Sequence, residues 1–181
     1  MSPHPTQFAL FDTELGTCGI AWTPDGVCAV QLPEATREQT SARLRKRFSS
    51  ARETMPTPEI AQAIEAIVAL LRGEGTALDS IRVDLAGVPQ FNRRVYDLAR
   101  AIPPGRTSTY GEIAVQLGDR TAARLVGQAL GQNPVPLIIP CHRVLAAGGK
   151  FGGFSANGGV LTKLRLLTIE KAPAADSLFP P

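Results

Sequence analysis

Residues 109–131 hold the sequence pattern that most restricts the fold, because they predict two short helices separated by a very tight turn. Thr109 and Glu112 match a capping box, in which the threonine side chain accepts a hydrogen bond from a backbone N–H and the glutamate side chain reaches back. Gly118 is expected to end the first helix, and the second is expected to run from about Ala122 to Leu130. Two short helices joined so closely are typical of a helix-turn-helix unit.

The second of these helices, which we expect Thr121 to cap and Gly131 to end, has an unusually flat outer face. Its predicted core stripe consists of Ala122, Leu125, Val126, Ala129 and Leu130. The opposite face carries Ala123, Arg124, Gly127 and Gln128. A glycine inside a helix costs about 1 kcal/mol relative to alanine, which indicates that something approaches the backbone closely there. On this pattern alone, a nucleic-acid groove and another protein segment are equally good candidates.

The first half of the chain predicts a small α/β unit. Strands are expected at residues 8–11, 18–22, 27–30 and 81–85, and helices at 36–50 and 59–71. Composition changes near Gly87, and a helix with Phe91, Val95, Leu98 and Ile102 on one face follows. We therefore predict a supporting domain at residues 1–86, a second domain at 87–173, and a frayed tail at 174–181.

Composition is compatible with a nucleic-acid partner without establishing one. The formal net charge is +3 and the isoelectric point is about 9.0. No apolar run approaches the roughly 20 residues of a membrane span, and no secretory signal is present at the start, so we expect a cytosolic protein without membrane contact. The densest basic run comprises Arg37, Arg43, Arg45, Lys46, Arg47 and Arg52. We interpret it as a solvated helix that adds at most non-specific, salt-dependent attraction to DNA.

The chain has three cysteines, and this odd number argues against a disulfide framework. Cys18 and Cys28 lie within strand-like sequence and are interpreted as small apolar residues. His4 and His142 are the two histidines, too few for a zinc site at familiar spacing, so no metal is expected.

Cys141 follows a proline at the end of an apolar run, where Leu137–Ile139 predicts a buried strand. An isolated cysteine there would be inert core, but His142 and Arg143 beside it can lower the pKa of the thiol. Adjacent residues of a regular strand point to opposite faces. His142 can therefore serve Cys141 only if the strand breaks here or if a water molecule bridges the two. Asn133 precedes a proline, and its side chain can bond to neighbouring turn groups.

The segment Pro140-Cys141-His142-Arg143-Val144 resembles the reactive-cysteine motif of the methylated-DNA–protein-cysteine methyltransferases, the O6-alkylguanine-DNA alkyltransferases. The resemblance covers roughly residues 88–171, and the first half is similar only in its loose α/β pattern. Its further motifs are Ile102-Pro103-Pro104-Gly105-Arg106-Thr107, Thr109-Tyr110-Gly111, Arg124-Leu125-Val126-Gly127, Gly131-Gln132-Asn133-Pro134, Gly153-Phe154-Ser155, Gly158-Gly159, Lys163-Leu164-Arg165-Leu166-Leu167 and Glu170. The resemblance implies a ribonuclease-H-like sheet with helices, followed by a mainly α, winged-helix-like helix-turn-helix domain.

The resemblance also implies the catalytic residues. Cys141 corresponds to the alkyl acceptor, and His142 to a base that acts on it through a water molecule. Glu170 corresponds to the carboxylate that orients this histidine. Tyr110 corresponds to the residue that donates a proton to the leaving guanine and helps to turn its phosphate. Asn133 corresponds to the hinge between the recognition helix and the cysteine loop.

The family lays its recognition helix in the minor groove, where Ala123, Gly127 and Gln128 would face the DNA. Arg124 corresponds to the arginine that enters the duplex in place of the flipped base, and Ser155 to a contact on the O6 side of that base. The family pattern differs here at Leu125, where alanine is frequent, at Phe154, where tyrosine is common, and in the loop 155–159, which is two residues longer than in some relatives.

The implied function is repair of O6-alkylguanine, and also O4-methylthymine, in double-stranded DNA by a monomer that reacts once and needs no cofactor. A thiolate is the soft nucleophile that such a displacement requires, and the thioether product is stable. One alternative is a sensor that binds alkylated DNA without taking the alkyl group, but such relatives lack the cysteine of the motif. Another is a Cys-His hydrolase, for which no oxyanion hole is indicated.

Overall fold

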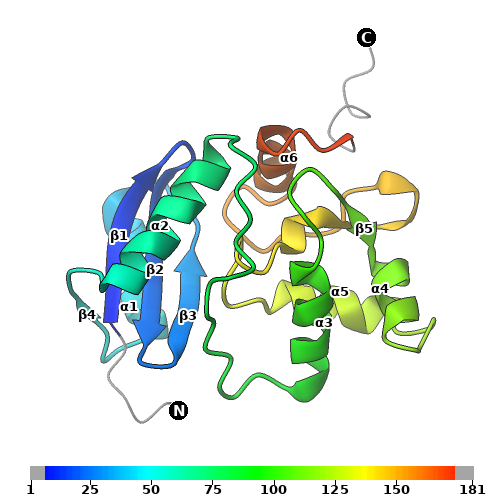
Figure 1. The fold of residues 1–181 in the computed structure, drawn as a ribbon, viewed down its shortest axis with the longest axis horizontal. Helices are drawn as coiled ribbons and strands as arrows, with labels where there is room; N and C mark the ends of the chain where they lie inside the picture. The colour runs from blue at the N-terminus through cyan, green and yellow to red at the C-terminus, as the bar shows by residue number, and fades with distance from the viewer. Residues whose placement is uncertain (1–6, 174–181) are drawn as a thin grey trace.

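The computed structural model describes residues 7–173, which form a sheet-containing half and a mainly helical half side by side (Figure 1). The sheet consists of β1 (Gln7–Thr13), β2 (Gly16–Thr23), β3 (Gly26–Gln31) and the short β4 (Arg52–Glu53). Its order is β3-β2-β1-β4, with antiparallel pairing among the first three and a parallel pair of β1 and β4. The three strands predicted before residue 32 and the α/β character of this half are confirmed.

Two helices cover opposite faces of this sheet (Figure 1). On one face, α1 (Arg37–Arg47) packs Leu44 into a small apolar cluster with Phe8. On the other, α2 (Pro58–Leu71) buries Ile67 in the main core. Both helices match the predicted segments, and the sheet is buried from both sides.

The strand expected at residues 81–85 is wrong. This segment pairs with β3 only through an isolated bridge between Val27 and Val83. The N–H of Val27 donates to the carbonyl of Arg82 (3.0 Å), and the N–H of Asp84 donates to the carbonyl of Val27 (2.8 Å). Asp84 then ends the pairing, because its carboxylate accepts from the Thr23 hydroxyl (2.6 Å) and from the N–H of Ala86 (2.9 Å). An aspartate that bonds to the backbone two residues ahead turns the chain instead of extending it.

The second half is built from helices and short irregular segments. The elements are α3 (Gln90–Arg100), β5 (Ser108–Thr109), α4 (Tyr110–Gln116), α5 (Ala123–Gly131), the 3-10 turn η1 (Cys141–Arg143), β6 (Val144–Leu145), η2 (Ala147–Gly149) and α6 (Val160–Ile169). The segments β5 and β6 form a small parallel pair. One core cluster contains Trp22 of the sheet together with Val95, Val126 and Ile139, so the two halves share their interior.

The capping box at the start of α4 is confirmed. The N–H of Glu112 donates to the Thr109 hydroxyl (3.1 Å), and the N–H of Thr109 donates to the Glu112 carboxylate (2.7 Å). Gly118 follows α4 with φ +88°, the left-handed conformation that stops a helix. The prediction that Thr121 caps α5 is wrong, because its hydroxyl and N–H both donate to Asp119 (2.6 and 2.8 Å). The helix α5 begins without a side-chain cap.

The predicted core stripe of α5 is too wide by one residue. Ala122, Val126, Ala129 and Leu130 are buried, whereas Leu125 is 51% exposed. Leu125 lies at the edge of the stripe and faces outward with Arg124. The outer face of α5 is therefore more apolar than the sequence predicts. Gly131 is itself the last residue of α5, so the helix ends one residue later than the predicted end at Leu130.

Cys18 and Cys28 pack as apolar residues, as predicted. Cys18 is fully buried in the main core, and burial raises the pKa of its thiol to about 12. Cys28 packs against the smaller cluster, and burial raises its pKa to about 11. Between residues 7 and 173, no group of three or more His, Cys, Asp or Glu is arranged to hold a metal ion. In the same part of the chain, no helix has the length and apolar character needed to cross a membrane.

Candidate active site around Cys141

The loop that leads to Cys141 is closed by Asn133. The side-chain amide of Asn133 donates to the carbonyl of Ile139 (2.7 Å), and its oxygen accepts from the N–H of Val135 (3.0 Å). The strand expected at Leu137–Ile139 is wrong: Leu137 has φ +74°, and the segment forms a compact turn. Three prolines, Pro134, Pro136 and Pro140, deprive this stretch of the N–H groups that a strand ladder needs. The segment is nevertheless buried, as the sequence indicates.

Cys141, His142 and Arg143 form the single 3-10 turn η1. No strand runs into the motif, so the strand geometry that would separate His142 from Cys141 is absent here. In a 3-10 turn consecutive side chains point about a third of a revolution apart, so neighbours need not face opposite sides. All three side chains are buried.

Cys141 is 8% exposed and borders a cavity of about 590 Å³. Asn133, Phe154 and Ser155 line the same cavity, so the sulfur is not sealed among aliphatic side chains. Burial raises the pKa of the Cys141 thiol, while the neighbouring Asn133 amide and the positive charge of Lys163 act in the opposite direction. Because burial prevails, the free protein holds a protonated thiol at neutral pH, and its activation requires a base.

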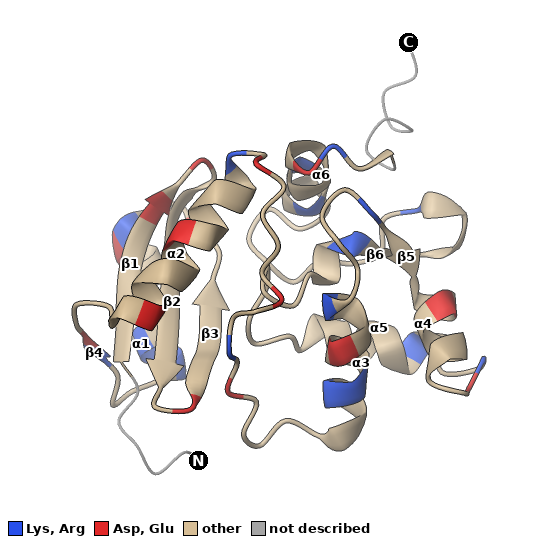
Figure 2. Cartoon of the chain, viewed as in Figure 1, with Lys and Arg blue, Asp and Glu red and all other residues tan. Residues whose placement is uncertain are grey.

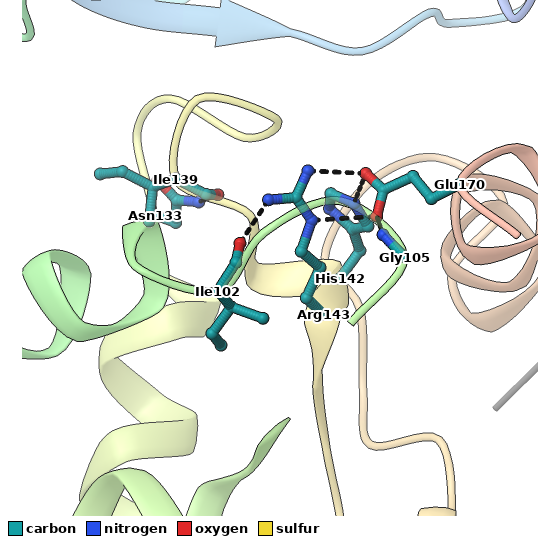
Figure 3. Close-up of polar contacts among 7 residues, drawn as sticks. All are labelled: Ile102, Gly105, Asn133, Ile139, His142, Arg143 and Glu170. Carbon is teal, nitrogen blue, oxygen red and sulfur yellow. Dashed lines mark hydrogen bonds and ion pairs between the residues drawn. The ribbon is translucent and has the colours of Figure 1, made fainter. Parts of the chain in front are cut away.

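Glu170, at the end of α6, holds His142 and Arg143 together (Figure 3). The Nε2 atom of His142 lies 2.8 Å from Oε1 of Glu170. Arg143 donates to both oxygens of the same carboxylate, from Nε (2.9 Å) and Nη2 (2.8 Å), and its Nη1 donates to the carbonyl of Ile102 (2.6 Å). Bidentate pairs of this kind fix geometry as well as contributing energy.

The charges of this cluster are settled by its hydrogen bonds. Burial tends to raise the pKa of Glu170, but the bonds from His142 and Arg143 outweigh it and hold that pKa at about 2. Burial lowers the pKa of His142, so the imidazole is neutral at pH 7 despite its bond to Glu170. The Nδ1 atom of His142 is buried and has no hydrogen-bond partner among residues 7–173. The site therefore contains a neutral imidazole with one nitrogen held and the other free to accept a proton.

The expectation that Arg143 lowers the pKa of the thiol is not met, because its guanidinium serves Glu170. The cation that acts on Cys141 is Lys163 of α6, which sequence reasoning did not single out. Lys163 is 1% exposed, and its ammonium donates to the carbonyl of Val144 (2.6 Å). Burial lowers the pKa of Lys163 to about 8. A signal was present in the sequence, because Lys163 shares a helix face with the buried Leu166 and Leu167.

Tyr110 is the first residue of α4 and is half-buried beside this cluster. The Lys163 ammonium lies 5.8 Å from the centre of the Tyr110 ring. A Cβ at Gly152 would clash with the ring and hydroxyl of Tyr110, so a side chain there would force Tyr110 to move. Burial, followed by the charge of Cys141, raises the pKa of Tyr110, which keeps its hydroxyl protonated.

The remaining predicted residues lie on the outer face of α5 and do not line the cavity. Arg124 and Gln128 are exposed, and Ala123 and Gly127 are partly exposed. No ion pair or side-chain hydrogen bond of Arg124 occurs within the described part of the chain. A Cβ at Gly127 would meet the Tyr110 ring at 3.8 Å, an ordinary contact. Internal packing therefore does not demand a glycine at position 127.

Comparison with known proteins gives the same picture over most of the chain. The family described as 6-O-methylguanine DNA methyltransferase, DNA binding domain, matches residues 90–172. A methylated-DNA–protein-cysteine methyltransferase of Mycolicibacterium paratuberculosis is 46% identical over 121 residues, which cover 66% of this chain and 71% of that protein. Another, of Methanothermobacter thermautotrophicus, is 36% identical over 152 residues, 84% of this chain and 78% of that protein. The crystal structure of Mycobacterium tuberculosis OGT in complex with DNA matches with a TM-score of 0.75 at 32% identity, covering 96% of this chain and 99% of that chain.

The mixed α/β fold and the buried Cys-His-Glu cluster beside a cavity define a protein whose chemistry centres on one cysteine. With these similarities, the chain belongs to the methylated-DNA–protein-cysteine methyltransferase family.

Proposed function

We propose that this protein repairs double-stranded DNA by moving the alkyl group of O6-alkylguanine irreversibly onto the Sγ atom of Cys141. The observation that carries the proposal is the position of Cys141 in one turn with His142, at the edge of a cavity open to a ligand. The name shared by the relatives supports DNA repair by alkyl transfer.

The proposed reaction uses the groups at the site without a cofactor. The neutral His142 accepts the thiol proton at Nδ1 through a bridging water, while Glu170 holds Nε2. The thiolate attacks the alkyl carbon, the S–C bond forms, and the bond from carbon to O6 breaks. Tyr110 donates its proton to the leaving guanine and regains a proton from His142 through the water. The net result is that the proton lost by the thiol is carried by the restored guanine. No group at the site reverses the thioether, so each molecule reacts once.

We further propose that α5 enters the minor groove and that the damaged nucleotide turns out into the cavity. Ala123 and Gly127 are small enough for close approach, Gln128 lies on the same face, and Arg124 is free to fill the gap in the base stack. Ser155, at the cavity wall, would contact the O6 side of the base, and Asn133 would act as the hinge of the cysteine loop. The crystal structure of the mycobacterial relative with DNA supports DNA as the partner.

Several finer features belong to the same proposal. The protein would act as a cytosolic monomer, would also repair O4-methylthymine, and would divide into a supporting domain at residues 1–86 and a DNA-binding domain at 87–173. The supporting domain would be ribonuclease-H-like, and the second a winged-helix-like helix-turn-helix. A sensor that binds lesions without taking the alkyl group is disfavoured, because Cys141 is present and faces the cavity.

The test is to incubate the protein with a duplex oligonucleotide that contains O6-methylguanine and to measure the mass of the Cys141 peptide. We expect one methyl group per molecule on Cys141, together with restored guanine. Cys141→Ala should abolish transfer while lesion binding persists. Restored guanine with an unmodified Cys141, or repeated turnover, would refute the mechanism.

A further inference from the structure

The cavity at Cys141 has a second wall that comes from the sheet-containing half. The end of β3 and the helix α1 contribute it, and three basic residues of α1 line the cavity: Arg43, Lys46 and Arg47. Figure 2 shows Lys and Arg positions, in blue, on α1 behind the sheet in that view. The basic run is solvated, as the sequence predicts, but three of its members also line the cavity that Cys141 borders.

The charges on this wall are unbalanced. Within residues 7–173, Glu34 is the one acidic residue that lines the cavity, and it already pairs with Arg43 at 3.2 Å. Among the described residues, Lys46 forms no ion pair, and Arg47 donates only to the carbonyl of Pro134 (3.4 Å). Partial burial lowers the pKa of Arg47. Two cations therefore face the cavity without a carboxylate partner, and an anion placed there would gain from both.

The cavity must hold the extruded guanine together with its alkyl group. At about 590 Å³ it lies within the range of about 300–1,000 Å³ of sites that enclose drug-sized ligands. Cys141, Pro136, Phe154 and the basic residues of α1 line one continuous space. An alkyl group long enough to extend away from the sulfur would point into a space bordered by Lys46 and Arg47.

We propose that Lys46 and Arg47 form an anion subsite, and that it favours O6-alkyl groups that end in a carboxylate over neutral groups of equal size. This inference rests on the proposed function, because it concerns which alkyl groups Cys141 accepts. The transfer itself is unchanged: the carbon bound to O6 moves to the sulfur, and the carboxylate remains on the transferred group. A phosphate of the DNA backbone could bind to the same cations. The experiment must therefore distinguish binding of the alkyl carboxylate from binding of a DNA phosphate.

The experiment measures second-order rates of transfer from three duplexes, which contain O6-carboxymethylguanine, O6-carbamoylmethylguanine or O6-methylguanine. The first two groups match in shape and differ in charge. Their rate ratio is compared between the parent protein and two variants, Lys46→Gln and Arg47→Gln, so intrinsic reactivity cancels. The control is Arg45→Gln, because Arg45 lies on the same helix, pairs with Glu53 (3.2 Å) and does not line the cavity.

We expect each cavity variant to lower the carboxymethyl-to-carbamoylmethyl ratio by about two- to five-fold, the range for partly exposed ion pairs. The Arg45→Gln ratio should stay at the parent value. Equal ratios in all four proteins would overturn the proposal. Equal slowing of all three substrates would also overturn it, since that pattern assigns the cations to a DNA phosphate. Failure of the proposed function is distinct, because O6-methylguanine itself would then transfer nothing to Cys141.

Arg47 contacts Pro134, so its variant could disturb the cysteine loop. Lys46→Gln decides the matter in that event, because Lys46 makes no such contact. A Lys46→Gln protein with normal methyl transfer and an unchanged ratio rules the subsite out.

Discussion

His142 and Glu170, 28 residues apart in the sequence, meet at 2.8 Å in a fully buried contact. Because the pKa of Glu170 is held at about 2, the carboxylate is ionised and Nε2 of the imidazole donates to it. The proton on Nε2 leaves Nδ1 unprotonated, which is the tautomer that a general base for Cys141 requires.

Glu170→Gln should impair both alkyl transfer and stability. An amide can bond to His142 through its NH₂ group and so favour the wrong tautomer, and it leaves the buried Arg143 without its counter-charge. Loss of one partner of a buried pair costs about 3–5 kcal/mol. The measurements are single-turnover transfer rates and urea unfolding. Glu112→Gln, at the exposed capping box, is the control for loss of a carboxylate, and a stable, fully active Glu170→Gln protein would contradict the arrangement.

The same cluster should make the protein sensitive to acid. The folded pKa of Glu170 is depressed, so its contribution is present above the unfolded value near 4.5 and is lost as the pH falls toward about 2. The shift corresponds to about 3 kcal/mol. The lowered pKa of His142 acts in the same direction, because the unfolded chain takes up a proton below its ordinary value of 6.5. Unfolding free energies measured from pH 7 to pH 2 should fall throughout, and the loss between pH 4.5 and 2 should be smaller in Glu170→Gln.

Lys163→Met should slow the alkylation of Cys141 below about pH 8, where Lys163 still carries the charge that favours the thiolate. The rate of Cys141 alkylation by iodoacetamide at each pH, followed on the Cys141 peptide by mass spectrometry, measures the thiolate fraction. Lys163→Arg should retain more of the parent rate than Lys163→Met, and Lys150→Met should leave the rates unchanged. Since the pKa of Lys163 is about 8, the rates of the parent and of Lys163→Met should converge above that pH. A purely structural role for Lys163 would lower stability in both variants without this pH-dependent difference in rate.

Local patterns predict the parts of the site that depend on neighbouring residues. The capping box of Thr109 and Glu112 and the loop closed by Asn133 follow from turn chemistry alone. The partners of Arg143 could not be found in this way, because they depend on a turn at residues 141–143 that brings α6 against the motif. The sequence predicts that the basic residues of α1 are solvated, but it could not predict that some of them line the cavity. Their place in the lining depends on how the two halves of the molecule pack together.

Gly127→Ala should separate stability from DNA binding. The added methyl group fits beside Tyr110 at 3.8 Å, so the helix should gain up to about 1 kcal/mol from the better propensity of alanine. If α5 lies against a DNA groove, the same methyl group holds the backbone away and weakens binding. Thermal unfolding and fluorescence anisotropy with a duplex measure the two effects. Ser41→Ala in α1 serves as a helix-stabilising control that should not change affinity, and unchanged affinity of Gly127→Ala would argue against close approach at this face.

Arg124→Ala tests whether α5 supports an extrahelical base. Arg124 is exposed on α5, so its removal should change the unfolding free energy by no more than about 0.5 kcal/mol. If the guanidinium fills the gap left by the turned-out nucleotide, its loss should slow transfer from a duplex far more than transfer from free O6-methylguanine base, which needs no extrusion. Arg120→Ala, in the turn before α5, is the matched control for loss of a positive charge. Equal slowing with duplex and free base would contradict this role. It would mean that Arg124 acts on the alkyl transfer itself and not on the extrusion of the nucleotide.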